Sequence, residues 1–235
     1  FIETYKSHPR LPNANLHLGV CYLKTDKLEP AAESFSTVIK AYPESDMAEA
    51  AHFYLGIAQY TMGQKGKAEM YDAAAESFNQ LLEKFPKSRY APQAVFYRGE
   101  CLYARGNKQG AADMYARLIK DYPESDLAAD AIYALGVTQE ELNQPAETGK
   151  TYDLFLEKFK EHGLRTEVIM RRGEVLFTQK QYAPAAQWLA VAAGKEDFAL
   201  ADHATMRQAA ALAMDKKLAE AAALYGTVAA KFPKS

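Results

Sequence analysis

Side chains that often carry catalysis or bind metals are scattered along this 235-residue chain. The five histidines share no ligand spacing with one another or with the two cysteines, so we predict no metal site. They are His8, His17, His52, His162 and His203. No serine or cysteine nucleophile comes with a recognisable partner motif, and we interpret Glu140 and Glu141 as surface charge instead of an acid–base pair. The sequence therefore predicts a protein that is not an enzyme and uses no cofactor.

A short stretch rich in glycine and lysine, from Gly63 to Lys67, has the composition of a phosphate-binding loop. It lacks the G-x-x-x-x-G-K-[ST] spacing that lets backbone N–H groups cradle phosphates, and it follows a predicted helix instead of a strand. We therefore interpret this stretch as a solvated turn.

The overall charge and composition exclude several classes of protein. Hydrophobic residues make up 49% of the chain, which is too much for an intrinsically disordered segment. The formal net charge is −2, whereas a general nucleic-acid binder needs a basic excess to neutralise phosphates. The sequence contains no run of 18 or more apolar residues. We expect no nucleic-acid partner and no transmembrane segment in this sequence.

The strongest pattern in the chain is a repeat with a period near 37 residues. The same position recurs six times, at Gly19, Gly56, Gly99, Gly136, Gly173 and Ala209, which we call the anchor residues. The steps between them are 37, 43, 37, 37 and 36 residues. Such a fixed period is typical of a solenoid, in which each repeat buries its apolar face against its neighbours. A chain of this kind presents an extended surface, which favours a function in binding.

Each repeat is predicted to contain two amphipathic helices, a helix A that carries the anchor and a helix B that follows it. Apolar residues at helical spacing indicate both helices. Phe53, Ile57 and Tyr60 recur in this way in the second helix A, and Phe35 and Val38 recur in the first helix B.

Polar residues and prolines predict where these helices begin and end. Ser45 and Asp46 are expected to cap the second helix A through a side chain. Proline is tolerated in the first turn of a helix and cannot continue the hydrogen-bond ladder at its end. The prolines expected near the start of helix B are Pro30, Pro145 and Pro184, and those expected to end it are Pro43, Pro86, Pro123 and Pro233. Six additional residues near Gly63–Lys67 predict either a longer turn or a longer helix A in the second repeat.

The recurrent glycines need a physical reason, because a glycine inside a helix costs about 1 kcal/mol relative to alanine. We predict that they allow a close approach between the backbones of helices A and B. Helix B carries matching small residues: Ala31, Ala74, Ala111, Ala185 and Ala221. Cys21 and Cys101 each follow an anchor by two residues, and we expect them to be free thiols that fill small core sites.

This order of residues resembles the tetratricopeptide repeat. The first repeat shows it with Leu18, Gly19, Tyr22, Ala31, Phe35 and Pro43, and the sixth shows it around Ala209 with Leu212, Ala221, Tyr225 and Pro233. The resemblance covers nearly the whole chain. The Tyr/Phe-Pro-x-Ser connection between repeats looks like bacterial cell-envelope members, such as the periplasmic partner of the Tol–Pal system and the lipoprotein of the outer-membrane β-barrel assembly machine. Lys160 and Asp197 stand in place of the proline in the fourth and fifth repeats.

The resemblance implies an all-α, right-handed superhelical solenoid of about six helix-turn-helix repeats, forming one domain over residues 1–235. Residues 1–11 would end an upstream repeat. The repeats are expected approximately at 12–45, 46–88, 89–125, 126–162, 163–198 and 199–235. Because the chain begins and ends inside repeat patterns, we expect a fragment of a longer protein. Leu224, Val228 and Phe232 would then be covered by residues beyond Ser235 or by a second copy, which allows self-association through uncapped ends.

In this family the concave surface is lined by helix A, so the resemblance places a peptide-binding groove on the matching residues here. Those of the first half are Leu16, Phe53, Tyr60, Phe96, Glu100 and Tyr103. Those of the second half are Asp130, Tyr133, Glu140, Glu141, Glu167, Glu174 and Phe177. The wall turns from aromatic to acidic along the chain. An alternative is that the aromatic residues stack between repeats and the carboxylates only keep the face soluble.

The sequence therefore predicts a non-catalytic scaffold that binds a protein or peptide partner in its groove. The acidic half favours a basic partner that also supplies apolar anchors. The resemblance implies a location in the bacterial cell envelope, periplasmic or associated with the outer membrane. The alternative is a regulatory or interaction module of a larger enzyme or sensor whose catalytic domain lies outside this sequence.

Overall fold

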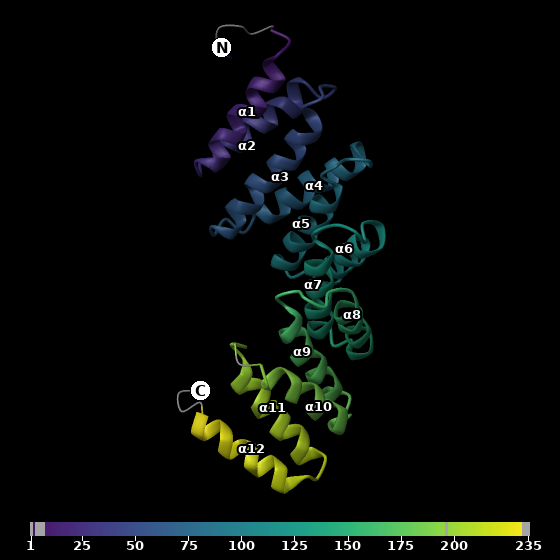
Figure 1. Ribbon diagram of the computed structural model, residues 1–235. Coiled ribbons are helices and arrows are strands. Elements are labelled where there is room, and N and C mark those ends of the chain that lie inside the picture. Colours follow the sequence, from purple (N-terminus) through teal and green to yellow (C-terminus); the bar gives the residue numbers. More distant parts are fainter. Residues whose placement is uncertain (1, 3–7, 196, 232–235) are drawn as a thin grey trace. The chain divides into compact units, whose positions relative to one another are not determined.

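The computed structural model describes residues 2, 8–195 and 197–231, and these residues form twelve α-helices and no strand (Figure 1). The chain divides into two compact units, Phe1–Ala128 and Ala129–Ser235. The first contains α1 (Leu11–Lys24), α2 (Leu28–Ala41), α3 (Ala48–Gln64), α4 (Met70–Lys84), α5 (Ala91–Ala104) and α6 (Lys108–Asp121). The second contains α7 (Ala128–Glu141, which starts one residue earlier), α8 (Pro145–Lys158), α9 (Arg165–Thr178), α10 (Tyr182–Ala193), α11 (Ala201–Met214) and α12 (Leu218–Lys231).

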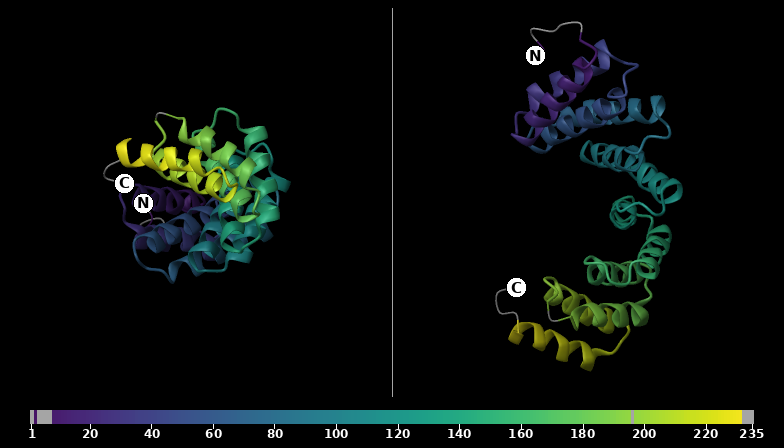
Figure 2. Two further views of the ribbon diagram at one scale, coloured as in Figure 1. Left: turned by 90° about the horizontal axis from the view of Figure 1, so that it is seen from below. Right: turned by 45° about the horizontal axis from the view of Figure 1, so that its top comes forward.

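Helices that follow one another along the chain pack side by side within each unit (Figure 2). One such series runs from α1 to α6, and another runs from α8 to α12. Odd-numbered helices carry the anchor residues and are the predicted helices A, and even-numbered helices are the predicted helices B. Buried apolar residues fill the space between them, such as Phe35, Val38 and Ala51 in the first unit. This arrangement confirms the predicted all-α array of helix-turn-helix repeats.

The six additional residues of the second repeat are divided between the helices and the turn. α3 has 17 residues, whereas the other helices A have 14. The turn at residues 65–69 is two residues longer than the turn at 25–27, and α4 has 15 residues whereas α2 has 14. The longer turn and the longer helix A, predicted as alternatives, are therefore both present.

The anchor glycines make room for a side chain of helix B. A Cβ atom added at Gly136 would lie 2.2 Å from Cε1 of Tyr152, and one added at Gly56 would lie 2.5 Å from Cε1 of Phe78. The equivalent pairs are Gly19 with Phe35, Gly99 with Tyr115 and Gly173 with Leu189. The expected close approach of two backbones is therefore wrong at Gly19, Gly56, Gly99 and Gly136, where the nearest atoms belong to side chains. At Gly173 the backbone N of Leu189 also lies 3.3 Å from the added Cβ.

Every turn between a helix A and its helix B contains one residue with a left-handed backbone. These residues are Asp26, Gly66, Gly106, Asn143, Lys180 and Lys216. Glycine adopts this conformation without a steric cost, which explains Gly66 in the stretch interpreted as a turn. Lys65 and Lys67 are exposed there, as expected. Gly63 differs, because it is buried in α3 against the ring of Tyr71.

The predicted prolines lie at or next to helix boundaries, but the predicted side-chain cap of α3 is wrong. Its N-cap residue is Met47, and no side chain caps the helix. In the equivalent connections the serine accepts an N–H group in the turn that precedes the helix. Ser88 Oγ accepts the N–H of Tyr90 at 3.0 Å, and Ser125 Oγ accepts that of Leu127 at 3.2 Å. Pro233 lies outside the described residues.

The two cysteines differ from each other. Cys101 is fully buried, as expected, and burial raises the pKa of its thiol to about 12. Cys21 is exposed, so the prediction that it fills a core site is wrong. Among the apolar residues expected at the uncapped end, Val228 is buried and Leu224 is partly buried, while Phe232 lies outside the described residues.

Candidate functional site

In the first unit, the predicted groove residues form a row of ring contacts along helices α3 and α5. The ring of Phe53 stacks on Tyr90 with centroids 4.6 Å apart, and Tyr60 lies 5.2 Å from Tyr97. Phe96 contacts Tyr97 edge-on at 5.7 Å. Leu16 is buried, and Tyr103 is half-buried. Much of this aromatic surface therefore also packs the repeats together.

Glu100 has a structural role beside the same row. Its Oε1 accepts a hydrogen bond of 2.6 Å from the hydroxyl of Tyr115, the helix-B ring that lies on Gly99. Tyr115 is 1% exposed, so its hydroxyl needs a partner inside the protein. Burial, together with the neighbouring charge of Glu100, raises the pKa of Tyr115 well above its usual value.

The second unit repeats this pairing with a different carboxylate. Glu140 Oε1 accepts a hydrogen bond of 2.7 Å from the hydroxyl of Tyr152, the fully buried ring on Gly136. The corresponding rings on Gly19 and Gly56 are phenylalanines, Phe35 and Phe78, which have no hydroxyl to satisfy. A helix-A carboxylate thus accompanies the buried tyrosine in each of these two repeats.

Arg171, on α9, links two of the predicted groove carboxylates. Its Nη1 donates to Glu140 Oε2 at 2.9 Å, and its Nε donates to Glu167 Oε1 at 3.0 Å. The hydroxyl of Tyr133 donates to the same oxygen of Glu167 at 2.5 Å, and the guanidinium lies 5.6 Å from the centroid of the Tyr133 ring. All four side chains are half-buried. Such a network is strong because each charge is both paired and hydrogen-bonded.

Burial and the neighbouring charges combine differently at each titratable group of this network. Burial raises the pKa of Tyr133 to about 12, and its hydrogen bond to Glu167 adds to this increase. Burial also raises the pKa of the Glu140 carboxyl, although Tyr152 and Arg171 stabilise its charged form. Burial opposes the charge of Arg171, but Glu140 and its neighbours raise the net pKa above the usual value.

Glu174, one turn further along α9, has a second set of partners from α11. Its Oε1 lies 2.9 Å from Nε2 of His203 and 3.3 Å from Nε of Arg207. The Arg207 guanidinium lies over the ring of Phe177, 4.5 Å from its centroid. Phe177 also contacts Tyr182 edge-on at 5.3 Å. Three of the predicted groove carboxylates are thus paired with basic side chains of the same unit.

An open cavity of about 290 Å³ adjoins these groups. Glu140 of α7, Glu174 of α9 and Arg207 of α11 line it together. The remaining lining residues are Asn143, Gln144, Pro145, Thr148, Val175 and Thr178. The cavity therefore combines two carboxylates, one guanidinium and several uncharged hydrogen-bonding groups, which suits the recognition of a polar ligand group.

The structure brings Glu140, Glu167 and Glu174 together, and it places the other two predicted carboxylates of this unit on α7. Asp130 is half-buried near the start of α7, and Glu141 is exposed at its end. Arg171 and Arg207 were not predicted from the sequence as members of the site. Both precede their anchors by two residues, so the repeat alignment itself contained a signal for their common position.

Within the described part of the chain, no group of three or more histidine, cysteine, aspartate and glutamate side chains could hold a metal ion. The described helices also include none with the length and apolar character needed to cross a membrane.

Residues 13–45 and 65–126 match family models of the tetratricopeptide repeat. No curated protein matches the sequence. A tetratricopeptide repeat protein from Parabacteroides merdae is 17% identical with a TM-score of 0.67, covering 93% of this chain and 79% of that one. YrrB, described as a TPR protein with an unusual peptide-binding site, is 17% identical with a TM-score of 0.67, covering 87% and 95%. PilF of Pseudomonas aeruginosa is 18% identical with a TM-score of 0.60, covering 96% and 94%.

Proposed function

This chain belongs to the tetratricopeptide repeat family, and we propose that it is a non-catalytic scaffold that binds a peptide or protein partner on its helix-A faces. Repeats of this family generally form protein–protein interaction surfaces. The cavity of about 290 Å³ in the second unit carries the proposal. Its walls come from the helices A α7, α9 and α11 together with the turn after α7 and the start of α8, so the cavity borders the helix-A surface on which the resemblance places the groove.

We propose that a basic side chain of the partner enters this cavity between Glu140 and Glu174. Both carboxylates line it. Burial raises the pKa of Glu140, and the neighbouring charge of Glu174 adds to this increase. A cation placed between them would relieve this repulsion. As a separate contact surface, we propose that the ring row of the first unit, at Phe53, Tyr60 and Phe96, takes apolar anchors of a partner.

Peptide selection on the purified chain tests the proposal. Peptides from a random library are captured, and the affinity of those enriched is measured by calorimetry at low salt. Glu174→Gln should weaken peptides that carry Lys or Arg several-fold, because it removes a charge and keeps the size. Glu157→Gln is the control, since Glu157 is exposed on α8 and does not line the cavity. Unchanged affinity of Glu174→Gln would refute the role of the cavity.

The salt dependence of binding offers a second measurement. Attraction between exposed charges is screened over about 10 Å at 0.1 M salt, so association should slow as salt rises. Glu140 and Glu167 are not suitable for substitution in this test, because both accept hydrogen bonds from tyrosine hydroxyls of the fold. A partner whose association rate is independent of salt would contradict a basic partner.

The cell envelope is the location that we propose for the full protein. The support is the Tyr/Phe-Pro-x-Ser connection, present at Tyr42, Phe85 and Tyr122. Fractionation of cells that express the full-length gene is the test. Recovery in the cytosolic fraction alone would contradict the proposal and would favour the module of a larger enzyme or sensor.

We also propose that α12 mediates self-association. On this helix Leu218 is 68% exposed and Tyr225 is 40% exposed. The residues that occupy the position of Tyr225 in the other repeats are at most 1% exposed: Phe35, Phe78, Tyr115, Tyr152 and Leu189. Sedimentation velocity over a wide range of concentration tests this, and strictly monomeric behaviour throughout would contradict it.

A further inference from the structure

A second cavity of the unit 129–235 lies at the connection between α8 and α9, and we infer that it binds the phosphate group of a small organic phosphate monoester. The cavity has a volume of about 480 Å³. Four of its lining side chains can carry positive charge: Lys160, His162, Arg165 and Lys195. This site is separate from the one proposed for the partner, since the two cavities share no lining residue.

The basic side chains of this connection are departures from the repeat pattern. Lys160 stands where the equivalent connections have Pro43, Pro86 and Pro123. His162 replaces the serine of those connections, and its Nδ1 takes over the serine's role by accepting the N–H of Leu164 at 3.2 Å. Arg165 stands at the helix start where α3, α5, α7 and α11 begin with alanine. Solenoid packing needs none of these basic residues, because the other repeats form without them.

Arg165 is held in place by the fold. Its Nη1 donates a hydrogen bond of 2.7 Å to the backbone oxygen of Leu156, and its side chain is half-buried. A guanidinium has five N–H donors, so the others can bind a ligand without further ordering of the side chain. Arg165 is also the first residue of the 14-residue helix α9, whose positive end adds to the attraction for an anion.

The charge around the cavity matches a dianion better than a monoanion. Lys160, Arg165 and Lys195 carry three positive charges, and Glu161 is the acidic residue among the lining side chains. The net charge of the lining is therefore +2 with His162 neutral. A phosphate monoester carries a charge of about −1.5 to −2 at neutral pH and offers three strong acceptor oxygens, whereas a carboxylate offers one charge and two oxygens.

Apolar side chains explain why we infer an organic phosphate in preference to the free ion. Ile169 and Val191 line the same cavity. Val191 is 52% exposed, which is unusual for a large apolar side chain in this chain. A short aliphatic group attached to the phosphate would cover it and gain from removal of that surface from water.

Calorimetry with propyl phosphate, inorganic phosphate and butyrate at equal ionic strength tests the inference. We expect one binding site, with propyl phosphate binding most tightly and butyrate most weakly. Two variants test the site, Arg165→Ala and Lys160→Pro, and each introduces the residue that other repeats have at the same position. Both variants should therefore fold, and circular dichroism verifies this. Each should weaken propyl phosphate about tenfold or more, because a charge-assisted contact is lost.

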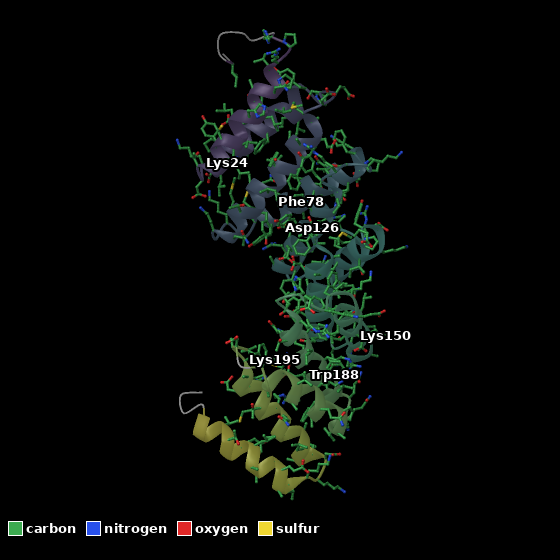
Figure 3. The ribbon with its side chains drawn as sticks, in the orientation of Figure 1. Lys24, Phe78, Asp126, Lys150, Trp188 and Lys195 are labelled. Atoms are coloured by element: carbon green, nitrogen blue, oxygen red, sulfur yellow. The ribbon has the colours of Figure 1, made fainter. Side chains whose placement is uncertain are left out.

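Lys150→Ala is the matched control, because Lys150 is an exposed lysine of α8 that does not line the cavity. Figure 3 shows Lys150 and Lys195 on different sides of this unit. The control should bind like the parent. Equal weakening by Lys150→Ala and Arg165→Ala, or absence of phosphate binding, would overturn the inference. Equally tight binding of inorganic and propyl phosphate would overturn its organic part.

Discussion

Replacement of Gly136 by alanine tests directly why the anchors are glycine. The added Cβ would lie 2.2 Å from Cε1 of Tyr152 and 2.7 Å from its Cζ, distances that real Cβ atoms do not adopt. The ring must therefore move, although it is fully buried and its hydroxyl is hydrogen-bonded to Glu140. Helix propensity alone would favour alanine by about 1 kcal/mol. The outcome depends on which of these effects is larger.

The steric effect should exceed the propensity. Overpacking a core costs about 1–3 kcal/mol, and loss of a hydrogen bond to a charged acceptor costs about 1.5–3 kcal/mol. Gly136→Ala should therefore lower the free energy of unfolding by about 1.5–5 kcal/mol after the gain in propensity, and Gly136→Leu should lower it further. Urea unfolding followed by circular dichroism at 222 nm measures the change.

Gly226→Ala is the control, because Gly226 also lies inside a helix, α12, and a Cβ there would meet no atom within 4 Å. This variant should be more stable than the parent by up to about 1 kcal/mol. The double variant Gly136→Ala, Tyr152→Leu should lose less stability than the two single variants together, because the clash is present only with the ring. If Gly136→Ala were as stable as Gly226→Ala, contact with a large helix-B side chain would not explain the anchor glycines.

Three further predictions concern a buried histidine, the two cysteines and a buried tyrosine. His52 is 2% exposed, and burial together with the charge of Lys84 lowers its pKa from the usual 6.5 to about 4. The free energy of unfolding should therefore fall by up to about 3 kcal/mol as the pH falls from 6.5 to 4, because the unfolded state binds a proton more readily. His52→Leu should remove this pH dependence in urea titrations. Cys21 should react with iodoacetamide in the native state and Cys101 only after unfolding, as measured by mass spectrometry. Tyr115→Phe should destabilise the first unit by about 1–3 kcal/mol, because Glu100 loses a buried donor; equal stability in urea would contradict this role.

The periodicity of the sequence was sufficient for the fold class. Proline positions identified the ends of α2, α4 and α6, because proline acts through its own backbone wherever it occurs. The cap of α3 was missed since a serine before a helix can bond several N–H groups, and only the backbone geometry selects one. Cys21 was misplaced because the position two residues after the anchor is buried by a preceding helix B, which α1 lacks among the described residues.

The candidate site was harder to predict, since its chemistry depends on contacts between repeats. Glu140, Glu167 and Glu174 were predicted from the sequence, but as charges available to a partner. The distances show instead that Arg171 and Arg207 pair with them from neighbouring turns and helices. Repeat alignment gives the position of a residue within its helix, but not which oxygen of the preceding repeat it reaches.

The pairing of buried tyrosines with groove carboxylates limits how this surface can change. Where the ring on the anchor is Tyr115 or Tyr152, helix A supplies Glu100 or Glu140 as the acceptor. Removal of either carboxylate would leave a buried hydroxyl without its partner, at a cost of about 1–3 kcal/mol. Replacement of Tyr152 by phenylalanine would leave Glu140 with Arg171 alone and open its Oε1 to a ligand. We therefore expect Tyr152→Phe to bind basic peptides more tightly than the parent while unfolding at lower urea, and weaker binding by a variant that remains folded would contradict the role of Glu140 in the cavity.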